Sequence, residues 1–110
     1  KYPLDHRADR MSAKPGHGMS FELEMPEGAQ VLTVQLQRDV PTLWALVAPG
    51  SSFKETRIFE VHGTGHDILN PDEVRYVGTF QLDGGKRIWH VFERKQLRDP
   101  KLFSEEVDDG

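Results

Sequence analysis

The stretch VRYVGTFQLDGGKRIWHVFE, residues 74–93, predicts a β-hairpin and decides the fold class. In its first half Tyr76, Phe80 and Leu82 fall on one face, and the second half alternates in the same way. This period of two is typical of half-buried strands. The DGG between the halves favours a tight hairpin turn. We therefore expect Leu82 and Ile88 to lie on paired antiparallel strands.

Two further runs alternate in the same manner. MSFELEM, residues 19–25, places its apolar side chains on one face, and so does QVLTVQLQ, residues 30–37. Leu32, Val34 and Leu36 of the second run are predicted to face inward. Both runs therefore predict strands with one face toward the core.

TLWALVA, residues 42–48, is apolar on both faces. A strand without a polar face is typically central and covered on both sides. We therefore expect Trp44→Ala to cost about 3–5 kcal/mol through loss of a large buried ring. The side chains predicted to be largely buried are Trp44, Leu46, Phe59, Phe80 and Phe92.

The sequence thus predicts an all-β, mainly antiparallel domain, a small sheet or sandwich of about six to seven strands joined by Gly/Pro turns, over residues 1–95. Residues 2–4 are expected to form an edge strand, because Pro3 is tolerated only at an edge. Residues 5–18 are predicted to be a flexible loop or an insertion. The tail, residues 96–110, is predicted to be a short helix or a frayed end.

Composition narrows the classes of function. The chain has 110 residues, no cysteine and a formal net charge of −4. Disulfides, a thiol nucleophile and thiolate metal sites are therefore excluded. Direct binding of nucleic acid is not expected, since that needs a basic surface. No apolar run approaches the length of a membrane span, so no membrane partner is expected, and no motif indicates a cofactor.

The stretch EVHGTGHDILNP, residues 60–71, holds the densest polar chemistry. Its glycines allow sharp turns and a close approach to a ligand, and its threonine and histidines offer directional hydrogen bonds. Three interpretations stay open: a structured turn first, contact with an anion or nucleotide second, and a metal site third. The candidate ligand-binding residues of this stretch are His62, Gly63, Thr64, Gly65 and His66.

Basic side chains favour the second interpretation. Arg57 and Arg87 complete the candidate ligand-binding set, and Arg75 and Lys86 lie on neighbouring predicted strands or turns. Backbone N–H groups of a Gly-x-Gly loop together with such cations could hold a phosphate or nucleotide. The P-loop ending is absent, so this signal is weak.

Catalytic and metal chemistry are less favoured. The His62-x-x-x-His66 spacing suits a metal on a helix, but glycines and a preceding strand make a helix improbable here. Asp67 or His90 would have to supply further ligands, and His90 is better explained as a hydrogen-bonded histidine in the core. A pair such as Glu60 and His62 could transfer protons, yet such pairs arise often by chance. We expect no enzymatic activity and no bound metal.

Five motifs occur in one order: MPEGAQVLTVQLQ, PTLWALV, RIFEVHGTGHDI, YVGTFQLDGG and IWHVFE. Together they resemble a family of small bacteriophage- and prophage-encoded proteins that carry a domain of unknown function. The resemblance covers residues 25–93 and the KYPL start, and residues 5–18 and the tail after Glu93 are expected to depart from the family pattern. It implies a phage gene product in the cytoplasm of a bacterial host.

Three function classes follow. The first is a non-enzymatic phage accessory protein that antagonises a host defence or regulatory component, by binding a host protein or by sequestering a nucleotide signal. The second is a phage structural or morphogenesis component. The third is a small hydrolase that uses the loop of His62 and His66. An exposed sheet edge invites pairing with another chain, so we also expect a homo-oligomer, most simply a two-fold dimer.

Overall fold

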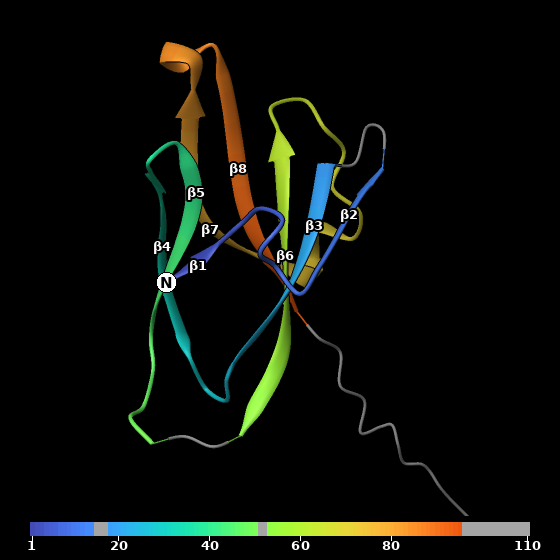
Figure 1. The fold of residues 1–110 in the computed structure, drawn as a ribbon. Helices are drawn as coiled ribbons and strands as arrows, with labels where there is room; N and C mark the ends of the chain where they lie inside the picture. Colours follow the sequence, from blue (N-terminus) through green and yellow to red (C-terminus); the bar gives the residue numbers. More distant parts are fainter. Residues whose placement is uncertain (15–17, 51–52, 96–110) are drawn as a thin grey trace, which may run out of the picture.

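A computed structural model of the chain describes residues 1–14, 18–50 and 53–95. These residues form two antiparallel sheets, one with the strand order β1-β5-β4 and one with the order β2-β3-β6-β8-β7 (Figure 1). The predicted all-β, mainly antiparallel fold is confirmed. Among the described residues there is no helix of the length and apolarity needed to cross a membrane.

The three-stranded sheet consists of β1 (Tyr2–Pro3), β5 (Val40–Leu46) and β4 (Gln30–Gln37). The five-stranded sheet consists of β2 (Arg10–Lys14), β3 (Gly18–Pro26), β6 (Lys54–Gly63), β8 (Arg87–Arg94) and β7 (Val74–Leu82). Short 3-10 turns precede and follow β7, namely η1 (Pro71–Glu73) and η2 (Asp83–Gly85).

The β7–β8 hairpin forms as the DGG motif predicts. Gln81 pairs with Ile88 and Leu82 with Arg87, so Leu82 and Ile88 lie on paired strands. Gly84 and Gly85 have φ values of 66° and 92°, a region that glycine enters without steric cost. The DGG motif therefore predicts the hairpin because the turn needs residues that adopt positive φ.

The core lies between the sheets, and β4 packs beside β7 where they meet (Figure 1). A Cβ atom added to Gly78 of β7 would lie 2.8 Å from Cγ1 of Val34, so the close approach depends on glycine. Phe59 and Phe80 are buried, as predicted. The buried apolar residues are Leu4, Phe21, Leu23, Met25, Ala29, Val34, Leu43, Phe59, Val61, Phe80 and Val91.

The expected burial of Trp44 and Leu46 is wrong, and Phe92 is only partly buried. Trp44 and Leu46 are 37% and 60% exposed, because β5 is central in its sheet but only its Leu43 face meets the core. Phe92 is half-buried on the outer face of the five-stranded sheet, where its ring packs against Tyr76. The loss expected for Trp44→Ala falls accordingly below the full cost of a buried ring.

The predicted inward row of β4 is only partly correct. Val34 is 4% exposed, but Leu32 is 55% exposed. A register shift between Val31 and Thr33 leaves Leu32 as an extra residue and changes the phase of the alternation. Leu36 is 37% exposed near the β4–β5 turn.

Residues 10–14, predicted to belong to a flexible loop or insertion, instead form β2, which pairs with β3 from Arg10↔Glu22 to Lys14↔Gly18. The expected edge strand near the start is present as β1, which pairs with β5. The helix or frayed end predicted for residues 96–110 lies outside the described residues.

Candidate functional site

Residues 63–66 form a structured turn at the end of β6. The His66 N–H donates to the Gly63 carbonyl at 3.0 Å, and the Gly63 N–H donates to His66 Nδ1 at 3.1 Å. Gly65 has φ of 91°, as a type II turn requires at its third residue. Thr64 Oγ1 lies 3.1 Å from His90 Nε2. The side chain of His66 therefore stabilises its own turn.

The structure does not bring Arg57 to this turn. At ~3.3 Å per residue, Arg57 lies roughly 20 Å from Gly63 along β6. Its guanidinium holds Glu93 between the sheets, with Nε 2.7 Å from Oε2 and Nη2 3.0 Å from Oε1. Arg87 is nearer to the turn, but its Nε donates to Asp83 at 2.8 Å. A phosphate would have to displace these carboxylates.

His62 does not share a site with His66. Its side chain is buried on the outer face of the five-stranded sheet, and Nε2 donates to Glu60 Oε1 at 2.9 Å. Its Nδ1 is buried without a hydrogen-bond partner and faces Gly18, where an added Cβ would lie 2.9 Å away. The two histidines therefore do not converge on a metal, and the described residues contain no group of three His, Cys, Asp or Glu suited to one.

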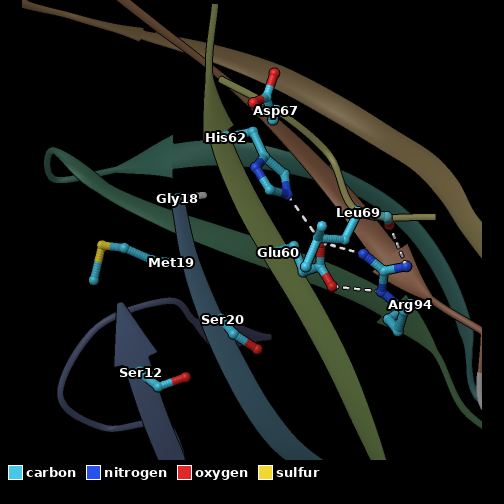
Figure 2. A pocket seen from close by; sticks show the side chains of 9 residues that line it. All are labelled: Ser12, Gly18, Met19, Ser20, Glu60, His62, Asp67, Leu69 and Arg94. Carbon is cyan, nitrogen blue, oxygen red and sulfur yellow. Dashed lines mark hydrogen bonds and ion pairs between the residues drawn. The ribbon is translucent and has the colours of Figure 1, made fainter. Parts of the chain in front are cut away.

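Arg94 completes a charged cluster with Glu60 and His62. Its Nε and Nη2 donate to the two carboxylate oxygens of Glu60 at 2.5 and 2.8 Å. Its Nη1 donates to the carbonyls of Leu69 and Asn70 at 2.8 and 3.2 Å. Arg94 thereby holds the β6–β7 connection against the sheet, as Figure 2 shows for Leu69.

The cluster fixes the ionisation of Glu60. Burial raises the pKa of Glu60, but hydrogen bonds from Arg94 and His62 together outweigh burial and hold the pKa below its ordinary value. Since an ionised carboxylate only accepts, His62 Nε2 must carry a proton. The other ring nitrogen, Nδ1, has no hydrogen-bond partner.

A polar pocket of about 220 Å³ lies beside this cluster. Figure 2 shows it between Ser12 and Ser20 of the β2–β3 hairpin and Asp67 of the connection. Sequence analysis missed Ser12, because residues 5–18 were expected to be a loop, and it placed Ser20 on a strand without assigning it to a site. The alternation of Ser12 with Met11 is the signal that could have placed it on a strand face.

An apolar pocket of about 190 Å³ opens between the two sheets. Phe80, Leu82 and Trp89 line it, with Arg87 as the charged residue of the lining. The Trp89 ring lies edge-on to His66, with 6.1 Å between ring centroids, so the structured turn borders this pocket.

His90 is hydrogen-bonded on both nitrogens, but it lies outside the core in which it was expected. Nε2 contacts Thr64, and Nδ1 lies 3.0 Å from Thr79 Oγ1. Thr79 Oγ1 is in turn 2.5 Å from the Tyr76 hydroxyl. This network lies on the outer sheet face and leaves neither ring nitrogen of His90 free.

The model of one protein family, a domain of unknown function (DUF7352), matches residues 10–101. The chain belongs to this family. The DUF7352 match includes β2 and extends past Glu93, and so spans segments where departures from the family pattern were expected. Comparisons with curated proteins and with solved structures return no match.

Proposed function

We propose that this member of the DUF7352 family is a non-enzymatic binding protein that holds an apolar side chain of a partner protein between its sheets. The observation that supports it is the apolar pocket lined by Phe80, Leu82 and Trp89. Aromatic and aliphatic pockets of this kind accept the anchor residues that dominate many protein interfaces.

The size of the pocket favours a protein over a nucleotide. Pockets for small ligands typically enclose about 300–1,000 Å³, whereas this one encloses about 190 Å³. Its lining is largely apolar, and its cation, Arg87, is paired with Asp83. A single side chain suits this space better than a base, sugar and phosphate.

The Glu60–His62 pair gives less support to a hydrolase. A carboxylate on one imidazole nitrogen orients a general base only if the other nitrogen reaches the reacting proton. Here Nδ1 is buried and has no hydroxyl bonded to it. His66 uses its Nδ1 within the turn.

The resemblance to phage and prophage proteins supports the biological context. A phage accessory protein in the host cytoplasm, antagonising a host defence or regulatory protein, would need a compact surface with one strong anchor. A structural phage component that docks through the same pocket is the second candidate, since exposed sheet edges suit assembly.

Site-specific photo-crosslinking in bacterial cells tests this proposal. A photoreactive residue replaces Met19, which is 36% exposed beside the pocket, or Leu46, which is 60% exposed on the outer face of the other sheet. We expect a discrete crosslink to a host protein from position 19 and none from position 46. Leu82→Glu should weaken binding of the purified partner at least tenfold while β-sheet circular dichroism is kept.

Other crosslinking patterns identify other functions. A product of twice the chain mass from position 19 would show that the pocket joins two copies, as in the expected homo-oligomer. A crosslink to phage virion proteins would favour the structural role. Crosslinks from position 46 alone would refute a partner site between the sheets. If Leu82→Glu does not fold, Met19→Glu at the pocket's edge serves the same purpose.

A further inference from the structure

Basic side chains gather at the end of β7 and β8 that lies away from their hairpin (Figure 1). Arg75 of β7 and Phe59 of β6 both pair with Glu93 of β8, so these residues form one row across the sheet. Arg57 and Lys95 each lie two residues beyond this row, where the period of two puts them on the face of Glu93. A cavity of about 380 Å³ opens there, and Arg57, Arg75 and Lys95 all line it.

Two guanidinium groups meet on one carboxylate oxygen in the wall of this cavity. Arg57 Nη2 and Arg75 Nη2 lie 3.0 and 2.8 Å from Glu93 Oε1. The other nitrogens of Arg57 donate to Glu93 Oε2 and to the Ala29 carbonyl. The side chain of Arg75, in contrast, is 65% exposed, and within the described residues its Nε and Nη1 have no hydrogen-bond partner. Glu93 therefore holds Arg75 in place and leaves it donors for a ligand.

Lys95 adds a second cation to the cavity. Its N–H donates to the Glu73 carbonyl at 2.7 Å, and its Nζ donates to the Asp72 carbonyl at 3.3 Å. In the part of the chain that the structure describes, no carboxylate pairs with this ammonium group. An ammonium has three donors, so the charge and two donors of Lys95 remain for a ligand.

The lining carries more positive than negative charge. Its three cations face two carboxylates, Glu55 and Glu93. Arg94 also borders the cavity, but Glu60 compensates its charge on the other face of the sheet. Burial raises the pKa of Glu93, but the arginines outweigh burial and hold the pKa below its ordinary value, so this carboxylate is ionised. An excess of one positive charge remains, and it favours an anion.

From these observations we propose that the cavity binds the phosphate group of a small phosphomonoester. Arg75 can donate to phosphate oxygens through its open nitrogens, and Lys95 supplies a second charge. Glu93 need not be displaced, because Arg75 contacts it through Nη2 alone. The basic side chains therefore meet a phosphate at the other end of β6 from the turn at Gly63.

The space suits a small molecule. A cavity of about 380 Å³ lies within the usual size of small-ligand pockets. A neighbouring cavity of about 400 Å³ shares Arg57 and Arg75 and reaches Val31 of β4, so it can take the organic part of the ligand. The site lies at the opposite end of β7 and β8 from the apolar pocket, and the inference does not depend on the proposed protein partner.

Titration of the full chain with ribose 5-phosphate, followed by ¹H–¹⁵N NMR at neutral pH and constant ionic strength, tests this inference. We expect saturable shifts of the Gly28 and Arg75 amides, and none from ribose, which lacks the phosphate. Arg75→Gln should weaken the affinity at least about tenfold, because charge-assisted hydrogen bonds are lost. Arg10→Gln should leave it unchanged and is the matched control, since Arg10 is an exposed cation on the other edge strand, 3.9 Å from a carboxylate oxygen of Glu22.

AMP separates two sources of a phosphomonoester, because it is ribose 5-phosphate with an added base. Affinity at least about fivefold above that of ribose 5-phosphate would identify a nucleotide as the ligand, and equal affinity would identify a metabolite without a base. If Arg75→Gln does not fold, Lys95→Gln at the end of β8 takes its place. Absence of saturable shifts, equal shifts from ribose, equal affinities in Arg75→Gln and Arg10→Gln, or displacement by equimolar acetate would each overturn the proposal.

Discussion

Two arginine–glutamate pairs join β6 to β8 in opposite order and on opposite faces. Arg57 of β6 holds Glu93 of β8 between the sheets, whereas Arg94 of β8 holds Glu60 of β6 on the outer face. Both pairs are bidentate. In both, burial raises the pKa of the carboxyl, but the partners together outweigh burial and lower it, namely Arg94 and His62 for Glu60 and Arg57 and Arg75 for Glu93.

The difference lies in what each pair holds. The inner pair is closed: Arg57 Nη1 also donates to the Ala29 carbonyl of the β3–β4 turn, and Arg75 donates to Glu93 at 2.8 Å. The outer pair fastens the β6–β7 connection and lies beside a polar pocket. The same chemistry thus stabilises the fold in one place and shapes a polar pocket in the other.

The largest expected effect is from Arg57→Met. Leaving a buried carboxylate without a partner typically costs about 3–5 kcal/mol, and because Arg75 still contacts Glu93 we expect a loss near the lower end of this range. The decrease in the free energy of unfolding is measured by urea denaturation. Arg57→Met combined with Glu93→Leu should recover most of the loss, because no buried charge then remains. A loss below about 1 kcal/mol in the single variant would show that the inner pair does not stabilise the fold.

Acid should destabilise the protein through both pairs. In the folded state the pKa values of Glu60 and Glu93 lie below the ordinary value of 4.5. Their contribution to stability is therefore complete above about pH 4.5 and is lost as the pH falls through the folded-state values. The urea concentration at the midpoint of unfolding is measured from pH 7 to pH 3. We expect it to decrease once the pH is below 4.5, and to decrease less steeply in Glu60→Gln and in Glu93→Gln. If the urea midpoint changes with pH equally steeply in wild type and variants, this prediction is contradicted.

His66→Ala should have the smallest effect. The exposed turn loses one neutral hydrogen bond, from Gly63 N–H to His66 Nδ1, which is worth about 0.5–1.5 kcal/mol. A decrease in the free energy of unfolding above roughly 2 kcal/mol would show that the turn, like the inner pair, contributes substantially to the stability of the fold. A rise in melting temperature with a mono-, di- or cyclic nucleotide, abolished by this variant, would instead support the predicted nucleotide contact.

Local backbone chemistry made much of the fold predictable. The DGG turn and the alternation of β3 appear in the sequence as the structure has them. Burial on the three-stranded sheet was not predictable, because whether Trp44 is covered depends on which face meets the other sheet. A single bulge at Leu32 likewise changes which side chains of β4 face the core.

The candidate site shows the same limit. The turn and its histidine were found from glycine spacing, but the partners of Arg57 and Arg94 come from strand pairing distant in sequence. Ser12 and Ser20 lie opposite each other only because β2 pairs with β3. Charge composition alone suggested free arginines, whereas the structure pairs them with glutamates or aspartate.

Hydrogen exchange of Arg94→Met tests most directly whether the outer pair holds a local element while the inner pair holds the whole fold. The His66 and Glu73 N–H groups are hydrogen-bonded within the β6–β7 connection, and the amides of Phe59 and Val91 lie in the core. We predict that exchange at His66 and Glu73 accelerates at least tenfold more than at Phe59 and Val91. Equal acceleration at all four amides would show that both pairs stabilise the fold as one unit and would contradict the account.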